Sequence, residues 1–348
     1  MQPSGIFNVS YGQEMAIVRT RLQWGILIGA LILLFTFPLF GSSYLVYLMN
    51  YLGITIILVL GLQIVTGYCG QVSFGQAAFM AVGAFSSAIL SAKLGLPFWV
   101  AMPLAGLITG AVGLIAGAPS LRIKGFYLAL ATLAAHFLIM WIITHLELTG
   151  RGGSLHVPPP TLGGLVFDTQ QSMYYIIMGV MVVMTFFAKN LVRTRVGRAF
   201  IAIRDNDLAA EVMGINVFRY KLLAFFISCF YAGIAGSLLA HWYMVVTPEQ
   251  FTLLHALWYI GMIIIGGLGS VSGVFFGVLF IRVLDELVLL VSPALGAALP
   301  FLGAAPAAAL GLTAFGLVLI LFLVFEPRGL ARRWEIFKAY YRLHPFSY

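Results

Sequence analysis

The chain has 348 residues, of which 61% are hydrophobic and only 9% are charged, and its mean hydropathy is +1.03. Soluble domains carry a charge on roughly a quarter of their residues, so this composition excludes a soluble protein and indicates an integral membrane protein. The net charge of +8 comes from basic residues spread over loops between apolar segments, which excludes a folded nucleic-acid-binding module.

Apolar stretches close to the length of about 20 residues that crosses a bilayer as a helix recur along nearly the whole chain. We predict an all-α polytopic fold with about ten transmembrane helices, some of them broken or re-entrant. The predicted domains are a cytoplasmic N-terminal segment 1–23, a transmembrane domain 24–326 and a cytoplasmic C-terminal tail 327–348. The predicted spans are 24–40, 44–66, 77–95, 97–118, 127–146, 173–190, 221–245, 256–270, 271–292 and 301–325.

The distribution of Lys and Arg predicts the orientation in the membrane, because these residues concentrate in cytoplasmic loops. If the N-terminus is cytoplasmic, ten spans leave only Lys93, Arg151 and Arg282 of the 19 basic residues outside cytoplasmic segments. We therefore predict that both termini are cytoplasmic. The first span is expected to be an uncleaved helix rather than a signal peptide, because its apolar run is long.

Residues 67–76 read GYCGQVSFGQ, a polar and glycine-rich segment between two apolar runs. One interpretation is irregular backbone at membrane depth, which is tolerated where it lines a cavity that lipid does not reach. The other is a tight turn between two helices at the cytoplasmic surface. The first interpretation predicts a solute path lined by Gly67, Gly70, Gln71, Ser73, Gly75 and Gln76.

Small residues repeat at helical spacing in two other places, where they would let membrane helices approach closely. One set is Gly106, Gly110, Gly113 and Gly117; the other is Gly266, Gly269, Gly273 and Gly277. In the predicted span 127–146, we expect His136 to be a hydrogen-bonded core residue rather than a proton relay.

The two long loops differ in kind. The predicted outer loop 147–172 contains TGRGG and three consecutive prolines, so we expect it to be irregular and extended. It either meets an external partner or connects two helices stiffly.

In the inner loop 191–220, Asp205 or Asn206 can cap a short helix at 207–213 that ends at Gly214. Such a helix is expected to lie against a lipid surface or a protein partner.

Charged residues also occur within a predicted span. Arg282, Asp285 and Glu286 are spaced i, i+3 and i+4, which places opposite charges on one helix face. We favour a local ion pair that faces neighbouring helices. The alternative is a carboxylate that couples transport to a proton or sodium gradient.

A short internal similarity links the two glycine-rich regions. Gly70 to Ser73 can be aligned with Gly269 to Ser272, an offset of 199 residues. Many transporters contain two related halves, often inverted, whose broken helices meet near the substrate site. This hypothesis adds three residues to the predicted path: Gly269, Ser270 and Ser272.

Several motifs together resemble the permease subunits of branched-chain amino acid ABC importers. They cover most of the chain: GYCGQVSFGQAAFMAVGAF, LRIKGFYLALATLA, LTGRGG, VGRAFIAIRDNDLAAEVMGINVFRYKLLAFFIS, IIIGGLGSVSGVFFG and FEPRGL. The resemblance implies an ATP-driven importer in a bacterial inner membrane. Its other parts would be ATP-binding cassette subunits, a second and paralogous permease, and a periplasmic binding protein.

The resemblance also implies how the subunits are coupled. Residues 207–214 fit the pattern E/D-x-A-A-x-x-x-G of the helix by which ABC permeases dock onto their ATPases, although the Leu-Pro that often follows is absent. Small alanines would allow close approach, and carboxylates would accept hydrogen bonds from the partner. The predicted docking residues are Arg204, Asp205, Asp207, Ala209, Ala210, Glu211 and Gly214.

The chain has no G-x-x-x-x-G-K-[ST] motif, so we expect ATP and magnesium to be held by partner subunits and no cofactor or metal by this chain. The implied substrates are branched-chain or related hydrophobic amino acids, with urea or short amides as an alternative. An ion-coupled secondary transporter remains open as a second class. A membrane enzyme is disfavoured, because the six histidines show no metal-ligand spacing.

Overall fold

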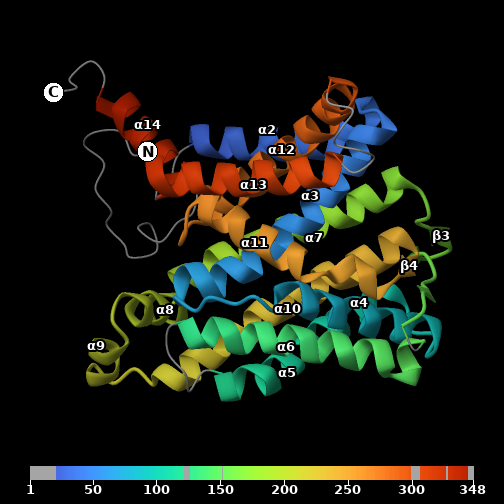
Figure 1. Ribbon diagram of the computed structural model, residues 1–348, viewed down its shortest axis with the longest axis horizontal. Helices are drawn as coiled ribbons and strands as arrows, with labels where there is room; N and C mark the ends of the chain where they lie inside the picture. The colour runs from blue at the N-terminus through green and yellow to red at the C-terminus, as the bar shows by residue number, and fades with distance from the viewer. Residues whose placement is uncertain (1–20, 121–125, 151, 299–305, 327, 344–348) are drawn as a thin grey trace.

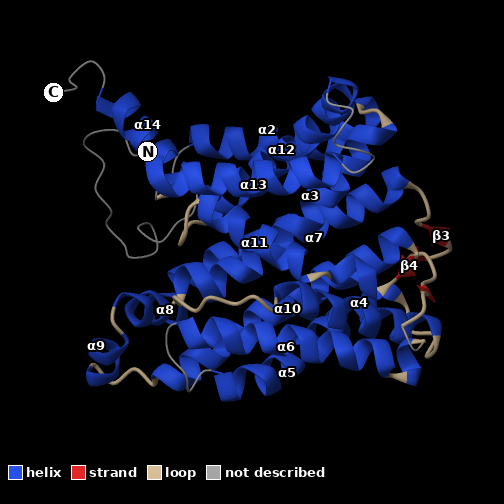
Figure 2. Cartoon of the chain, in the orientation of Figure 1, coloured by secondary structure: helices blue, strands red, loops and turns tan. Residues whose placement is uncertain are grey.

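The computed structural model describes residues 21–120, 126–150, 152–298, 306–326 and 328–343, and its helices lie roughly parallel to one another in one bundle (Figure 1). Most of the described chain is helical, with a few short strands at one end of the bundle (Figure 2). The helices before the outer loop are α2 (Arg21–Phe40), α3 (Ser43–Leu62), the π-helix η1 (Gln63–Tyr68), α4 (Gln76–Ala92), α5 (Phe98–Ser120) and α6 (Phe126–His145).

The rest of the chain contains a second group of long helices and two amphipathic helices between them. Its helices are η2 (Glu147–Thr149), α7 (Gln170–Arg193), α8 (Arg195–Asp205), α9 (Asp207–Val212), α10 (Val217–Tyr243), η3 (Pro248–Phe251), α11 (Leu253–Gly266), α12 (Val271–Ala298), α13 (Pro306–Phe325) and α14 (Gly329–Leu343). Every span predicted from the sequence overlaps a described helix, and the first residues of the last predicted span, 301–305, lie outside the described residues.

The number of helices that pass a simple membrane test is smaller than the predicted ten. Seven described helices are long and apolar enough to cross a bilayer, or eight if the bent pair of α13 and α14 counts as one span. Helix α4 has only 17 residues, and α12 contains three charged side chains. The polytopic helical fold is therefore confirmed, whereas the count of about ten is not.

The ends of the bundle differ in the loops that they carry. Helices α8, α9 and α14 lie at one end, and strands β3 (Leu165–Val166) and β4 (Val245–Val246) lie at the other (Figure 1). In the outer loop, β1 (Leu155–His156) pairs with β4, and β2 (Thr161–Leu162) pairs with β3. This loop is otherwise irregular, as predicted. The separation of the two ends agrees with the predicted topology, which stays a prediction, as do the domain boundaries.

Helix α10 is the centre of the bundle, and it packs against α3, α4 and α5. The predicted glycine face of α5 meets it directly: a β-carbon on Gly110 would lie 2.6 Å from the Phe226 ring, and one on Gly113 would lie 2.4 Å from the Cys229 sulfur. On the other side, a β-carbon on Gly236 would lie 2.1 Å from the carbonyl oxygen of Met80 in α4. Small residues thus allow these helices to pack at close range.

Helices α11 and α12 form a similarly close pair. A β-carbon on Gly266 would lie 2.1 Å from the carbonyl oxygen of Gly273, and one on Gly277 would lie 1.9 Å from that of Met262. Gly269 does not take part in this packing, because it lies in the turn between the helices with φ +77°. The predicted packing role is confirmed for Gly266, Gly273 and Gly277 and is wrong for Gly269.

Replacing Gly236 by Ala is expected to lower the free energy of unfolding by about 1–3 kcal/mol, because the added methyl group would overpack the contact between α10 and α4. The measurement is thermal unfolding of the purified protein in detergent. Gly179→Ala in α7 is the control, since no heavy atom lies within 4 Å of the position of its β-carbon. Equal melting temperatures for Gly236→Ala and the native protein would contradict the close contact.

Candidate functional site

The first glycine-rich segment interrupts a helix and then runs as extended chain. Helix α3 continues into the π-helix η1, which ends at Tyr68, and the next regular element is α4, which begins at Gln76. Gly70 makes the reversal with φ +73°, a left-handed conformation that favours glycine. Downstream of it, the Gln71 amide N–H donates to the carbonyl of Val65 (3.0 Å), and the Thr66 hydroxyl donates to the carbonyl of Gln71 (2.9 Å).

The chain then returns along α3 instead of making a tight turn. The Gln76 side-chain amide donates to the carbonyl of Leu58 (3.4 Å) and to that of Ser228 in α10 (3.3 Å). Leu58 precedes Tyr68 by ten residues, which is roughly 15 Å along a helix. The break therefore runs along the interior of the bundle from the end that carries α8, and α4 begins partway along α3 (Figure 1).

The two glycine-rich segments that the sequence aligned are in direct contact. The Gln63 side-chain amide donates to the carbonyls of Gly267 (2.9 Å) and Ser270 (3.1 Å), and a β-carbon on Gly67 would lie 2.7 Å from the backbone nitrogen of Gly269. Gly70 and Gly269, which the alignment pairs, share a left-handed backbone, with φ +73° and +77°. The repeat hypothesis requires that the two broken segments meet, and this contact satisfies that requirement. The repeat itself stays a prediction.

The remaining residues of the predicted path differ in their surroundings. Ser73 is 1% exposed, and its hydroxyl has no hydrogen-bond partner in the part of the chain that the structure describes. Gly75 is also buried and leaves space for the Phe79 ring. In the second segment, the hydroxyls of Ser270 and Ser272 lie 2.9 Å apart, and Ser270 accepts the Gly273 N–H at the start of α12.

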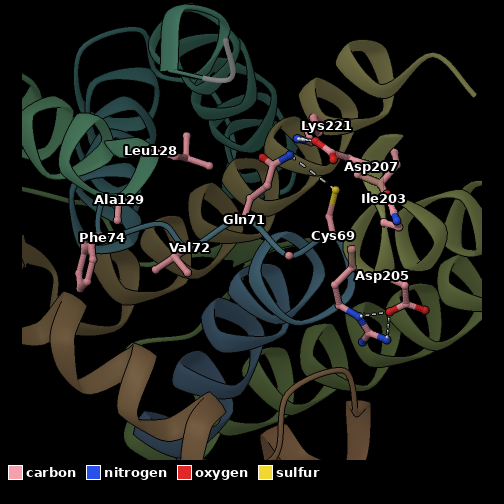
Figure 3. Close-up of a pocket in the computed structure, with 13 residues that line it drawn as sticks. Cys69, Gln71, Val72, Phe74, Leu128, Ala129, Ile203, Asp205, Asp207 and Lys221 are labelled. Carbon is pink, nitrogen blue, oxygen red and sulfur yellow. Dashed lines mark hydrogen bonds and ion pairs between the residues drawn. The ribbon is translucent and has the colours of Figure 1, made fainter. Parts of the chain in front are cut away.

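A cavity of about 670 Å³ lies between the first break and the inner loop (Figure 3). Its polar lining includes the Gln71 amide, which is 2% exposed and whose side-chain oxygen has no partner among described residues. It also includes the ion pair of Asp207 and Lys221 (3.6 Å) and the side chains of Arg204, Asp205 and Asn206. The apolar wall consists of Val72, Phe74, Leu128, Ala129 and Ile203.

The inner loop folds as two helices, much as the sequence predicts. The Asn206 side chain accepts the Ala209 N–H (3.1 Å) and caps α9, and Gly214 ends the turn with φ +84°. Helix α8 packs through Phe200 and Ile203, both buried, and it contacts α7, α9, α10 and η1. The short helix α9 is thereby fixed at the end of the bundle (Figure 1).

The predicted docking residues do not all face outward. Ala210 is only 4% exposed, and Asp207 pairs with Lys221, so neither offers the free surface that the motif implies. The Arg204 guanidinium pairs with Asp205 (2.9 Å) and donates to the carbonyl of Gly67 (3.1 Å), so it points toward the first break.

The outward surface of α9 contains Ala209 and Glu211 together with exposed apolar side chains. Leu208 is 63% exposed, Val212 is 87% exposed and Met213 is 82% exposed. Large apolar side chains at a polar end of the molecule are typical of a protein interface. Sequence reasoning concentrated on the carboxylates and alanines and missed this surface, which the apolar letters at 208, 212 and 213 could have indicated.

The charged residues of α12 pair with one another within the protein. Arg282 pairs with Glu286 (2.8 Å) and with Asp285 (4.0 Å), and its guanidinium lies over the Tyr51 ring, 4.7 Å from the ring centre. The Tyr44 hydroxyl donates to Glu286. The predicted local ion pair is therefore confirmed, together with aromatic partners on α3 that the sequence did not indicate.

Two histidines are buried in the described part of the bundle. His136 is 2% exposed, as predicted for the core, but its Nδ1 has no hydrogen-bond partner among described residues. His241, which the sequence did not single out, lies within hydrogen-bond distance of Ser91 (3.1 Å) and of the carbonyl of Ser237 (2.9 Å). No group of three His, Cys, Asp or Glu residues that could hold a metal occurs in the described ranges.

Residues 44–323 match the protein family described as branched-chain amino acid transport system / permease component. This match covers most of the chain and includes both glycine breaks and the inner loop. The chain belongs to this family. Comparison with solved structures gives no match.

Relatives within this permease family include two proteins named high-affinity branched-chain amino acid transport system permease protein LivM. The one from Salmonella typhimurium strain LT2 is 35% identical over 259 residues, which is 67% of this chain and 61% of the relative. The one from Escherichia coli K12 is 34% identical over 286 residues, 75% of this chain and 67% of the relative. The autoinducer 2 import system permease protein LsrC of Enterobacter sp. strain 638 is 28% identical over 202 residues, 54% of this chain and 57% of the relative.

Replacing Gln76 by Leu is expected to lower the stability of this permease-family chain by about 1–3 kcal/mol, because the buried Ser228 hydroxyl would lose its acceptor. Ser73→Ala is the matched control in the same segment and should change stability little, since its hydroxyl has no partner to lose. Thermal unfolding in detergent measures both. A larger loss for Ser73→Ala than for Gln76→Leu would contradict this assignment of contacts.

Proposed function

We propose that this chain is the membrane-spanning permease subunit of an ATP-driven importer for branched-chain or related hydrophobic amino acids. Membership of the permease family supports this function. The structural observation that carries it is the cavity in which the first glycine break meets α8 and α9. An importer that is driven by cytoplasmic ATP-binding subunits needs a contact between its docking helix and its solute path.

The proposed path runs along the two glycine breaks. Gln71 from the first break and Gly269 from the second lie in irregular backbone inside the bundle, where protein rather than lipid surrounds them. Gly67 lies in the π-helix that leads into the first break. Gly70, Ser73, Gly75, Gln76, Ser270 and Ser272 support or line the same segments. The proposed orientation has both termini in the cytoplasm, so the cavity beside α9 is its inner mouth.

The cavity has the chemistry that an apolar amino acid requires. A bound amino acid would exchange with the Asp207–Lys221 ion pair, its ammonium group facing Asp207 and its carboxylate facing Lys221. The Gln71 oxygen, which has no partner among described residues, can accept an N–H. The side chain of the substrate would lie against the apolar wall of the cavity. Weak, divided contacts of this kind suit a site from which the solute must leave.

The proposed partners are ATP-binding cassette subunits, a second permease subunit and a periplasmic substrate-binding protein, in a bacterial inner membrane. ATP and magnesium would be bound by the cassette subunits, because this chain lacks a P-loop motif. The docking surface for a cassette subunit consists of the exposed side of α9. Its apolar residues would supply the contact area, and Glu211 a carboxylate for a basic partner group.

Two alternative functions can be compared with specific features of the chain. An ion-coupled transporter would need a carboxylate that gains and loses a cation, whereas Asp285 and Glu286 are both paired with Arg282. Another ABC substrate, such as urea or a short amide, is compatible with the family, since a relative is named for autoinducer 2 import. The apolar wall of the cavity favours a hydrophobic amino acid over these small polar solutes.

Replacing Val212 by Asp is expected to abolish association with the cassette subunits, because it places a desolvated charge in the middle of an apolar contact. The measurement is co-purification of the cassette subunits with the tagged chain from detergent extracts. Leu165→Asp is the matched control: it changes an exposed apolar residue, 68% exposed, at the opposite end of the bundle. Equal co-purification of Val212→Asp and Leu165→Asp would contradict docking through α9.

A further inference from the structure

We propose that Arg204 is the mechanical link through which movement of α8 and α9 reaches both glycine breaks. This inference rests on the proposed function, since it assigns a role within an ATP-driven importer. In this proposal, the Arg204 side chain acts through its contacts with the glycine breaks of the same chain. It is a positioning residue for the solute path and not a contact for the ATP-binding partner.

The first contact of Arg204 is with the end of η1. Its Nη1 donates to the carbonyl of Gly67 (3.1 Å), 137 residues earlier in the chain. Carbonyls at the end of a helix lack partners within the helix, and a charged donor satisfies them well. Movement of Arg204 with α8 must therefore either pull the end of η1 with it or break this hydrogen bond.

The same guanidinium lies against the second break. A β-carbon on Gly269 would be 2.8 Å from Nη1 of Arg204 and 3.4 Å from the carbonyl oxygen of Gly67. At Gly70 a β-carbon would be 3.0 Å from Cγ of the same arginine. Both glycines have positive φ, and both lack the side chain that would exclude the arginine. Three segments far apart in the sequence thus meet at one side chain.

Asp205 holds the guanidinium in this direction. Both Nε (3.0 Å) and Nη2 (2.9 Å) donate to the same carboxylate oxygen of Asp205, which leaves Nη1 free to reach Gly67. Asp205 is the last residue of α8, directly before the Asn206 cap of α9. A displacement of α9 is therefore carried to the guanidinium through its carboxylate partner.

Arg198, another arginine of α8, provides a contrast. Arg198 donates from Nη1 to the carbonyl of Arg193 (3.2 Å), which lies at the end of α7 in the same stretch of chain. In the part of the chain that the structure describes, no hydrogen bond joins Arg198 to Gly67, Gly70 or Gly269. A general requirement for positive charge on α8 would affect both arginines, whereas a link to the breaks requires Arg204 alone.

The test measures coupling in proteoliposomes that contain this chain with its cassette subunits, second permease and binding protein. Leucine uptake and ATP hydrolysis are recorded together for the native complex, Arg204→Gln and Arg198→Gln. We expect Arg204→Gln to assemble and hydrolyse ATP while uptake per ATP falls by about tenfold or more, which is within the range of coupling between linked sites. Arg198→Gln should keep the native ratio.

Two results would overturn the inference. One is a native ratio of uptake to ATP hydrolysis in Arg204→Gln, including the case in which both fall in proportion, which indicates a purely structural role. The other is an equal loss of this ratio in Arg198→Gln. If Arg204→Gln does not assemble, Asp205→Asn replaces it, because this change keeps the arginine and weakens only its orientation. Uptake per ATP should then fall, and an unchanged ratio overturns the link. Absence of ATP-driven leucine uptake by the native complex would instead contradict the proposed function.

Discussion

The structure depends on one constraint: backbone N–H and C=O groups within a bilayer must find partners inside the protein. Seven residues, 69–75, leave the helical pattern within the bundle, so the surrounding helices have to supply those partners. The Thr66 hydroxyl satisfies the carbonyl of Gln71, and the Thr132 hydroxyl in α6 accepts the N–H of Phe74 (3.0 Å). These bonds fix an extended segment where a membrane helix would otherwise continue.

The same constraint explains why distant parts of the chain converge. The end of η1 and the turn between α11 and α12 each expose backbone groups, and polar side chains from elsewhere satisfy them. The Gln63 side chain donates hydrogen bonds to carbonyls of the second break, and Arg204 donates one to the carbonyl of Gly67 beside the first. Because Arg204 belongs to the inner loop, the loop and both breaks form one connected unit. In the proposed importer this unit joins the docking helix to the solute path.

Much of this architecture could be predicted from local sequence patterns. Apolar runs located each long helix, and the letters Asn206 and Gly214 located the limits of α9. Length and charge explain the difference in span count, since α4 is short and α12 carries Arg282 and its partners. The glycine face of α5 was predictable because helical periodicity alone defines it.

Long-range contacts could not be predicted in this way. Nothing in the sequence near Arg204 indicates that its side chain points to Gly67, and only tertiary packing buries Ala210, which has the same local pattern as exposed Ala209. Gln63 lies in an apolar run and could have been noticed as an isolated polar residue. Its partners, Gly267 and Ser270, follow more than 200 residues later and depend on the fold.

The most direct test of the central claim is leucine uptake by proteoliposomes that contain this chain, its partner permease, the cassette subunits and the binding protein. We predict uptake with ATP and magnesium in the compartment of the cassette subunits, and none when they are omitted and a proton or sodium gradient is imposed. Gradient-driven uptake by this chain without the cassette subunits would contradict an ATP-driven permease.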